Sequence, residues 1–269
     1  MLGNKFFHDT VRKYVAVFGT LFNDLTLYRV NRFGETIEEI EVPLSYGPRD
    51  KFIARLKDEN LDRPIALQLP RIGYELSRMD YDPNRKGAST LKIVDKTQPA
   101  TAKVLYEPVP YTFFFSVQIM TATHEDGVRL VEQILPFFKP DFTPKIKLIS
   151  QPEVIRDIPI TLQSVTVQEI YQGNFEERRA VMHDLSFRMQ GFLFGPVRDV
   201  PLILEANTNF YVSGFSANTY GTEAYEYVSV VPGQDANGNP TTNTSIAVAA
   251  NTIVPNSNYG YIVTTTRIE

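Results

Sequence analysis

One stretch, residues 111–142 (YTFFFSVQIMTATHEDGVRLVEQILPFFKPDF), constrains the fold of this chain more than any other. Four apolar residues recur at the strand period of two and define one face: Phe113, Phe115, Val117 and Ile119. Phe114 and Met120 keep the other face partly apolar, which is typical of a strand covered on both sides. We therefore predict a strand in the middle of a sheet.

The second half of this stretch predicts a capped helix. Thr123 offers a side-chain oxygen to the free amides of the first turn, where Glu125 and Asp126 suit the positive end of the helix dipole. Four apolar residues follow at helical spacing: Val128, Val131, Ile134 and Leu135. Pro136 ends the helix. The whole stretch is predicted to be core and to carry no chemistry.

Further helices and strands are predicted on both sides of this stretch. Residues 4–24 have an apolar stripe typical of a helix: Phe7, Val11, Tyr14, Phe18, Leu21 and Leu25. Two strands, 25–30 and 36–44, are joined by a turn with Gly34, and the slip in alternation at Glu39 is typical of a bulge. We expect a short helix at 49–58, a strand at 72–81, a loop or weak strand at 87–110, and an antiparallel pair of strands at 158–171 and 181–194.

The composition changes near Glu205. After it, Arg267 is the only basic residue, and Asn, Thr, Ser and Gly are frequent. The β-prone runs YEYVSVV, SIAVAA and YGYIVTTT remain, and DANGNP at 235–240 predicts a turn. We predict a domain over 1–205 and a polar, β-rich extension over 206–269, whose arms lie on the main domain or on a neighbouring subunit.

Composition excludes several classes of protein. The formal charge of −4, with 27 basic and 31 acidic residues, gives no reason to expect nucleic acid or an anionic membrane as a partner. The chain has no cysteine, so disulfides and thiolate chemistry are excluded. No apolar segment approaches the ~18 residues that a membrane-spanning helix needs. A secretory signal is not expected, because the apolar run 14–22 is short and has no cleavage site.

No residue pattern predicts catalysis. The three histidines, His8, His124 and His183, have no metal-ligand spacing. The loop that starts at Asp80 begins like a calcium loop but has Arg85 and not Gly at its sixth place. Phosphate-binding loops and nucleophile elbows are absent from the sequence. We therefore expect no catalytic, metal-binding or cofactor-binding residues and no enzyme.

Several stretches together resemble a known family. They are NKFFHDTVRKYVAVFGTLFNDL, EIEVPLSYGPRDKF, LPRIGYELSRMDY, VEQILPFF with KPDF, and ERRAVMHDLSFRMQGFLFGPV. In this order they resemble the tail sheath stabiliser and completion proteins of T4-like contractile-tailed phages, over most of residues 4–200. The segment VEQILPFF with KPDF is the most specific. Residues after about 205 show no such resemblance.

The resemblance implies a fold and a set of partners. The implied fold is α+β, a mixed or antiparallel sheet flanked by helices as in other tail terminators, followed by the β-rich extension. The implied function is structural: a homohexameric ring at the head-proximal end of the tail that caps tube and sheath, holds the sheath extended and connects to the neck. Its partners would be other copies of the chain, the tail sheath protein, the tail tube terminator and neck or head-completion proteins. The protein would be assembled in the host cytoplasm and would need no cofactor.

Two charged turns are the candidate contact sites, because a ring protein works through its surfaces. Their residues are Arg85, Lys86, Glu176, Glu177, Arg178 and Arg179. Two other functions remain open at this point: another tail or neck component, and a stand-alone carbohydrate- or ligand-binding module. The absence of tryptophan weighs against a sugar-binding platform.

Overall fold

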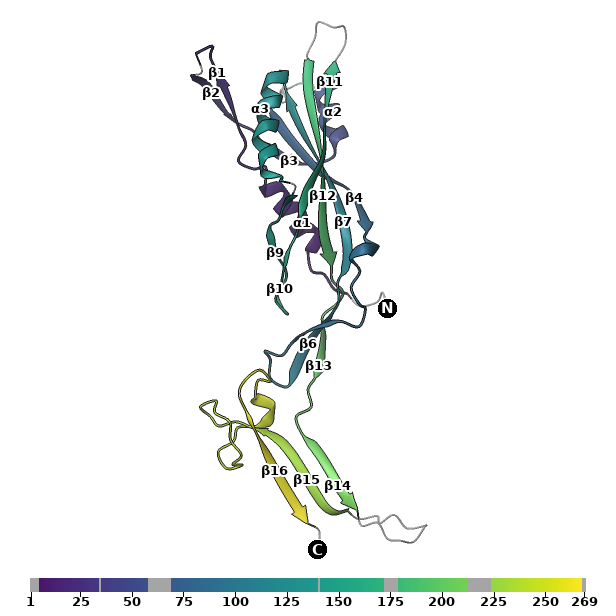
Figure 1. Cartoon of the computed structure of the whole chain (residues 1–269), viewed down its shortest axis with the longest axis vertical. Coiled ribbons are helices and arrows are strands. Elements are labelled where there is room, and N and C mark those ends of the chain that lie inside the picture. The colour runs from purple at the N-terminus through teal and green to yellow at the C-terminus, as the bar shows by residue number, and fades with distance from the viewer. Residues whose placement is uncertain are drawn as a thin grey trace. The chain divides into compact units, whose positions relative to one another are not determined.

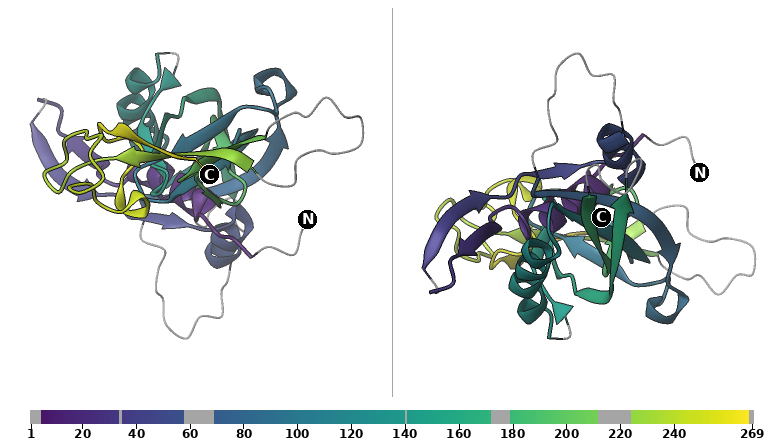
Figure 2. Two further views of the ribbon diagram at one scale, coloured as in Figure 1. Left: turned by 90° about the horizontal axis from the view of Figure 1, so that it is seen from below. Right: turned by 90° about the horizontal axis from the view of Figure 1, so that it is seen from above.

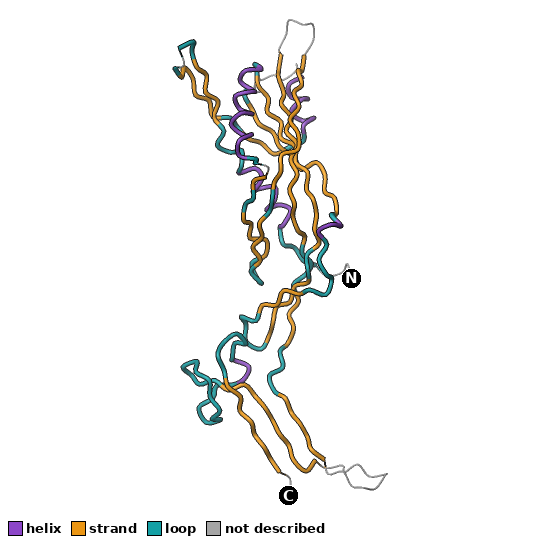
Figure 3. The backbone as a smooth tube through the Cα atoms, in the orientation of Figure 1, coloured by secondary structure: helices purple, strands orange, loops and turns teal. Residues whose placement is uncertain are grey.

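The structure is a computed structural model, and it describes residues 5–33, 35–57, 69–139, 141–171, 179–211 and 224–267. Strands make up most of its regular structure, and the described helices are short (Figures 1 and 3). The predicted sheets are present, but the α+β description with flanking helices holds only in part. The chain divides into two compact units, which are described separately: unit 1 is Met1–Ala88 with Pro108–Phe194, and unit 2 is Ser89–Glu107 with Gly195–Glu269.

A mixed six-stranded sheet forms the centre of unit 1, as far as the chain is described. Its order is β3 (Leu44–Tyr46), β4 (Arg71–Tyr81), β7 (Val109–Thr121), β12 (Arg179–Leu193), β11 (Ile160–Tyr171) and β8 (Asp141–Phe142). Neighbouring strands are antiparallel, except that β3 runs parallel to β4. β7 is paired with β4 on one side and with β12 on the other, so the prediction of a strand in the middle of a sheet is confirmed.

One face of this sheet carries an aromatic core. The four residues predicted to share a face of β7 are at most 1% exposed. α1 (Thr10–Thr20) lies on this face and stacks Phe18 on Phe115, with ring centroids 4.2 Å apart. Phe187 of β12 meets Phe18 edge-on at 5.3 Å. Each such ring pair contributes about 0.5–1.5 kcal/mol beyond the burial of its area, so these contacts fix the position of α1 on the sheet.

The first helix is shorter than the predicted span of 4–24. The backbone of Asp9 is left-handed, with φ of 56°, and the helix begins only after it. Phe7 is 83% exposed and therefore lies outside the predicted apolar stripe. Beyond the end of the helix the buried side chain is that of Phe22 and not that of Leu21. The stripe fails at both ends because the chain leaves helical geometry there.

α3 (His124–Ile134) begins at the predicted cap. The Thr123 hydroxyl oxygen accepts a hydrogen bond from the Asp126 amide at 3.2 Å. This bond satisfies one of the amides that the first turn leaves without a helical partner. The helix is followed by the short 3₁₀ turn η2 (Leu135–Phe137), which contains Pro136, so its predicted end is confirmed.

Two of the four predicted apolar positions of α3 are wrong. Val131 and Ile134 are buried, but Val128 is 44% and Leu135 is 40% exposed. The helix instead turns its Gly127 towards the sheet, where a Cβ would collide with the β12 side chain beneath it. The absence of a side chain at this position lets the helix approach the sheet closely.

The opposite face of the sheet is covered by α2 (Arg49–Lys57). Its Phe52 is 3% exposed and packs against Met120 and Met182. Met120 alternates with Ile119 along β7 and so belongs to the other face. Both faces of β7 are therefore covered, as predicted.

Two hairpins complete unit 1: β1 (Thr26–Val30) with β2 (Thr36–Glu41), and β9 (Lys145–Ile149) with β10 (Val154–Asp157). The first confirms the predicted pair, although its register shifts between Arg29 and Val30 and not at Glu39. Gly34, the predicted turn residue, lies outside the described residues. The long pair predicted at 158–171 and 181–194 is confirmed as β11 and β12.

The described part of unit 2 forms two small antiparallel sheets. The bounds of their strands are β5 (Lys92–Asp95), β6 (Thr101–Tyr106) and β13 (Arg198–Pro201) in one, and β14 (Ala206–Tyr211), β15 (Ala224–Gly233) and β16 (Gly260–Arg267) in the other. The region expected as a loop or weak strand at 87–110 thus supplies two short strands and the start of β7. Two of the three predicted β runs after residue 205 are strands. The run SIAVAA is not one, and only a single bridge joins Ala247 to Asp235.

The predicted turn at 235–240 is present in unit 2. The Asp235 carboxylate accepts hydrogen bonds from the amides of Asn237 and Asn239 at 2.9 and 2.8 Å. Gly238 has φ of 84°, a conformation that glycine adopts without strain. Hydrogen bonds from the turn, above all the one from the Asn239 amide, outweigh burial and lower the pKa of Asp235.

Tyr14 fills a gap in the backbone hydrogen bonding of β12. β11 starts at Ile160, opposite Met189, so Phe192 lies beyond the β11 ladder. The Tyr14 hydroxyl donates to the Phe192 carbonyl and accepts from the Phe192 amide, both at 2.9 Å. Burial raises the pKa of Tyr14 to about 12, so the hydroxyl keeps its proton at neutral pH.

Replacing this hydroxyl should destabilise unit 1. Tyr14→Phe leaves two backbone groups of Phe192 without their partner, and we expect the free energy of unfolding to fall by about 1–3 kcal/mol. Urea unfolding followed by circular dichroism measures the loss. Tyr46→Phe, at a side chain that is 57% exposed, is the matched control. Equal effects of the two substitutions would contradict the assignment.

Candidate interaction surface

The β1–β2 hairpin projects from the central sheet of unit 1 beside α3 (Figures 1 and 2). Three of its large apolar side chains are exposed: Phe33 at 89%, Ile37 at 69% and Tyr28 at 45%. Four acids on it, Glu35, Glu38, Glu39 and Glu41, are exposed as well. Exposed apolar groups rimmed by charge are typical of surfaces that bind other proteins.

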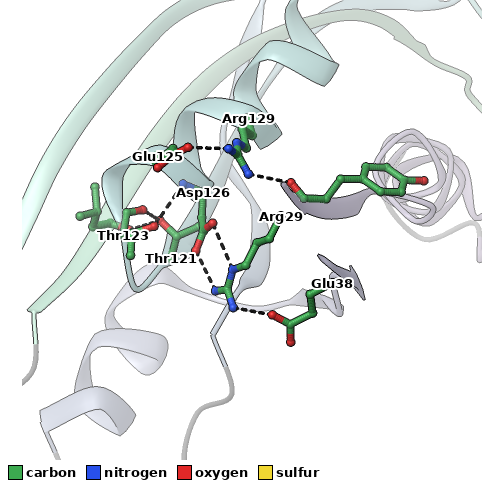
Figure 4. Close-up of polar contacts among 9 residues, drawn as sticks. Arg29, Glu38, Thr121, Thr123, Glu125, Asp126 and Arg129 are labelled. Atoms are coloured by element: carbon green, nitrogen blue, oxygen red, sulfur yellow. Dashed lines mark hydrogen bonds and ion pairs between the residues drawn. The ribbon is translucent and has the colours of Figure 1, made fainter. Parts of the chain in front are cut away.

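An ion pair anchors the hairpin to α3 (Figure 4). Arg29 donates through Nε and a terminal nitrogen to the two carboxylate oxygens of Asp126, at 3.3 and 2.8 Å. Its other terminal nitrogen binds Glu38 across the hairpin at 2.9 Å. Two parallel bonds between a guanidinium and a carboxylate fix direction as well as distance. The pair therefore sets the orientation of the hairpin on the helix.

Asp126 is well placed to stay charged. Its exposure is 5%, and burial alone would raise its pKa. The hydrogen bonds with Arg29 and with the capping Thr123 outweigh burial and lower the pKa of Asp126. Bonds to Asp126 and Glu38 correspondingly hold the pKa of Arg29 above its usual range.

The same helix end is tied to the central sheet. The Thr121 hydroxyl, at the end of β7, donates to the carbonyl oxygen of Thr123 at 2.8 Å. Thr123 in turn caps α3, as described above. A short polar chain thus links β7, the cap of α3 and the hairpin (Figure 4).

Two side chains of α3 cover the outer edge of β1. Arg129 donates to the carbonyl oxygen of Tyr28 at 2.8 Å, and Gln133 donates to that of Thr26 at 2.9 Å. These two carbonyls lie two residues apart and point away from β2. Arg129 is itself held by an ion pair with Glu125, one turn earlier in the helix. α3 therefore satisfies β1 on the side that β2 does not pair.

The candidate contact residues that the structure describes lie outside this hairpin. Arg85, at the end of η1 (Pro83–Arg85), forms an ion pair with Asp82 at 2.8 Å and donates to the carbonyl oxygen of Tyr111 at 2.9 Å. It thus belongs to the half-buried structure of unit 1. Lys86 is exposed. Residues 176–178, which contain Glu176, Glu177 and Arg178, lie outside the described residues, and Arg179 is the first residue of β12.

The histidines form no metal site in the described part of the chain. His124 stacks on His183 with ring centroids 5.6 Å apart. His183 is 2% exposed, and its two ring nitrogens have no hydrogen-bond partner among the described residues. Burial, and after it the neighbouring His124, lower the pKa of His183, which favours the neutral ring. Across the described ranges no group of three or more potential metal ligands comes together.

Most of the chain is similar in sequence to known proteins. Residues 5–249 match the T4-like virus Myoviridae tail sheath stabiliser family. The chain belongs to this family. It is also similar to the Tail completion protein gp15 of Enterobacteria phage T4, with 27% identity over 219 residues, which cover 77% of this chain and 79% of the relative.

Family membership confirms the resemblance seen in the sequence and extends it. The match continues to residue 249, so it includes much of the segment after 205 that showed no resemblance. As a tail sheath stabiliser, the chain is a structural protein of the virion tail. No helix among the described residues is long and apolar enough to span a membrane.

Sequence reasoning missed the anchored hairpin as a surface. Arg29 and Asp126 lie 97 positions apart, so no local pattern connects them. A usable signal was the run TIEEIE, which has no consistent apolar face and is exposed throughout except at Ile40. Such a strand has no side to bury in its own domain.

Breaking the anchor should release the hairpin. Arg29→Ala leaves the Asp126 carboxylate buried without its partner, and we expect a loss of about 1–3 kcal/mol, since Arg29 itself is partly solvated. Amide hydrogen exchange should rise in residues 26–41 and remain unchanged in β7. Glu38→Gln, which removes only the exposed ion pair, should cost less than about 0.5 kcal/mol. Unaltered exchange in Arg29→Ala would show that the pair does not anchor the hairpin.

Proposed function

We propose that this sheath stabiliser forms a homohexameric ring at the head-proximal end of a contractile phage tail. There it caps the tube and the sheath, keeps the sheath extended and connects the tail to the neck. The observation that carries the proposal is the match of residues 5–249 to the sheath stabiliser family. The name of the similar phage T4 protein, a tail completion protein, supports it.

A terminal cap must bind the end of a polymer without offering a new site for growth. Head-to-tail contacts that close into a ring meet this need, because every binding surface is then occupied by a neighbour. The partners we propose are other copies of the chain, the tail sheath protein, the tube terminator and the neck or head-completion proteins. The protein acts in the virion tail after assembly in the host cytoplasm. We assign it no catalytic step and no cofactor.

Charged surface turns are proposed to contribute to the contacts with partners. Lys86 is exposed, and Arg85 beside it is held within unit 1 by Asp82 and Tyr111. We therefore place the partner contact of this turn on Lys86. Arg178 and Arg179 remain candidates from the sequence, together with Glu176 and Glu177.

Reconstitution tests the proposed function. Purified protein, added to tails assembled without it, should keep the sheath extended and allow heads to join. Electron micrographs should show a sixfold ring at the head-proximal end of the tail. A variant with Lys86, Arg178 and Arg179 replaced by Glu should join heads more slowly, whereas Lys51→Glu, at an exposed position of α2, serves as the matched control. A protein located elsewhere on the particle would refute the proposal.

The segment 206–269 is proposed to be an arm that adds strands to a neighbouring subunit or partner. β16 is an outer strand of the sheet β14-β15-β16, and its Tyr261 and Val263 are each 60% exposed. Outer strands with exposed apolar groups can accept another strand through main-chain hydrogen bonds.

Truncation after Glu205 tests the arm. We expect the shortened chain to keep the central sheet of unit 1, since the strands of that sheet all precede residue 194. It should bind extended sheath at least about tenfold more weakly, which corresponds to 1.4 kcal/mol. Circular dichroism checks the fold, and co-sedimentation with sheath measures the binding. Equal binding and equal oligomer mass of the two proteins would exclude the arm.

A further inference from the structure

The β1–β2 hairpin has one covered edge and one open edge. α3 satisfies the outer carbonyls of β1, as shown above. β2 has only β1 as a neighbour in the described chain. The Val42 amide donates to the Leu25 carbonyl, so the alternation of an antiparallel ladder directs the backbone groups of Glu39 and Glu41 outward. These groups line the open edge.

The central sheet has open edges of its own, along the later half of β4 and along β11 beyond Thr161, and cationic side chains lie beside that of β4. β3 pairs only with the segment from Ile72 to Tyr74, and no described strand lies beside the rest of β4. The Asp82 amide donates to Pro110 on the β7 side, so the same alternation directs the backbone groups of Met79 and Tyr81 outward. Their side chains are 49% and 46% exposed. An uncovered strand edge with apolar groups is a site for pairing with another chain.

The two edges lie on opposite sides of unit 1. The hairpin projects on one side of the central sheet, and β4 with the turn after it lies on the other, in all three views (Figures 1 and 2). One copy can therefore contact two neighbours at once, one through each edge. This is the arrangement that a head-to-tail ring needs.

Charge directs the pairing of the two edges. Four exposed acids crowd the hairpin, so two β2 edges placed together would repel each other. Beside the open part of β4, Arg78 is 64% exposed and pairs with Asp80, and Lys86 is exposed. Arg78 and Lys86 can approach the hairpin acids when β2 lies beside β4, whereas β2 beside β2 brings like charges together.

We propose that β2 of one copy adds as a strand to the open edge of β4 in the next copy. The central sheets of successive copies are then joined through their hairpins around the ring. The inference rests on the proposed ring and names the contact that closes it. Hydrogen bonds between the main chains supply the attachment, and the acids of the hairpin select the heterologous partner.

Proline substitution tests the two edges separately. Glu39→Pro and Met79→Pro each remove an outward amide, and proline is tolerated where the amide of an edge strand faces solvent. Each variant should run as smaller species than the wild-type ring in native mass measurement. Glu39→Ala and Met79→Ala keep the amide and should keep the ring. Circular dichroism checks that every variant is folded.

Mixing the two proline variants gives a sharper result. A Glu39→Pro copy keeps an intact β4 edge, and a Met79→Pro copy keeps an intact β2 edge. An equimolar mixture should form dimers of one copy of each, whereas neither variant alone should. Dimers in either variant alone, or none in the mixture, would overturn the head-to-tail pairing.

Cross-linking tests the contact without disturbing the ladder. The chain has no cysteine. Glu39→Cys and Met79→Cys copies, mixed and treated with a short bismaleimide, should form covalent dimers only in the mixture. Cross-linking within Glu39→Cys alone would show β2 pairing with itself and overturn the proposal.

The outcomes separate this inference from the proposed function. Proline variants that still form the ring overturn the β2–β4 contact and leave the ring itself standing. Variants that keep the ring but fail to bind sheath also overturn it, because the edges then receive the sheath protein. A wild-type protein that forms no ring, alone or on tails, refutes the proposed function and this inference with it.

Discussion

Coverage of both faces of β7 is the constraint on which the rest of unit 1 depends. α1 seals one face with aromatic rings, and Phe52 of α2 seals the other with two methionines. A strand in this position has no face to offer a ligand, and its neighbours fill both of its edges. The surfaces that can contact another molecule therefore lie on the hairpins, the turns and the outermost strands. A tail protein that works by assembly has its surfaces in those places.

Sequence-based prediction worked best where a single apolar periodicity extends over a whole strand or helix. The alternation of Phe113, Phe115, Val117 and Ile119 located the central strand, because every second residue is buried on a strand whose faces are both packed. The Thr123 cap was equally predictable, since it depends only on neighbours within three residues. Both features are local and need no knowledge of distant contacts.

Prediction failed where contacts between residues distant in the sequence determine which side chains are buried or paired. The stripe of α3 was assigned partly to the wrong residues, because Gly127 and not a large side chain faces β12. Phe7 was predicted to belong to the apolar stripe of the first helix, but it is exposed, because the helix begins only after the left-handed backbone of Asp9. The anchor between Arg29 and Asp126 joins two elements far apart in the chain, and the helix-cap pattern that contains Asp126 does not indicate Arg29 as its partner. Most of the candidate surface was therefore out of reach of local patterns, and only the irregular run of β2 hinted at it.

The polar chain through Thr121, Thr123, Asp126 and Arg29 has a mechanical consequence. A pulling force on the hairpin would pass through the two hydrogen bonds between Arg29 and Asp126 to the Thr123 cap of α3. From there it would pass through Thr121 to the end of β7. The six-stranded sheet would take up that force along strands bonded edge to edge, so a pull on the hairpin would be resisted at the centre of unit 1.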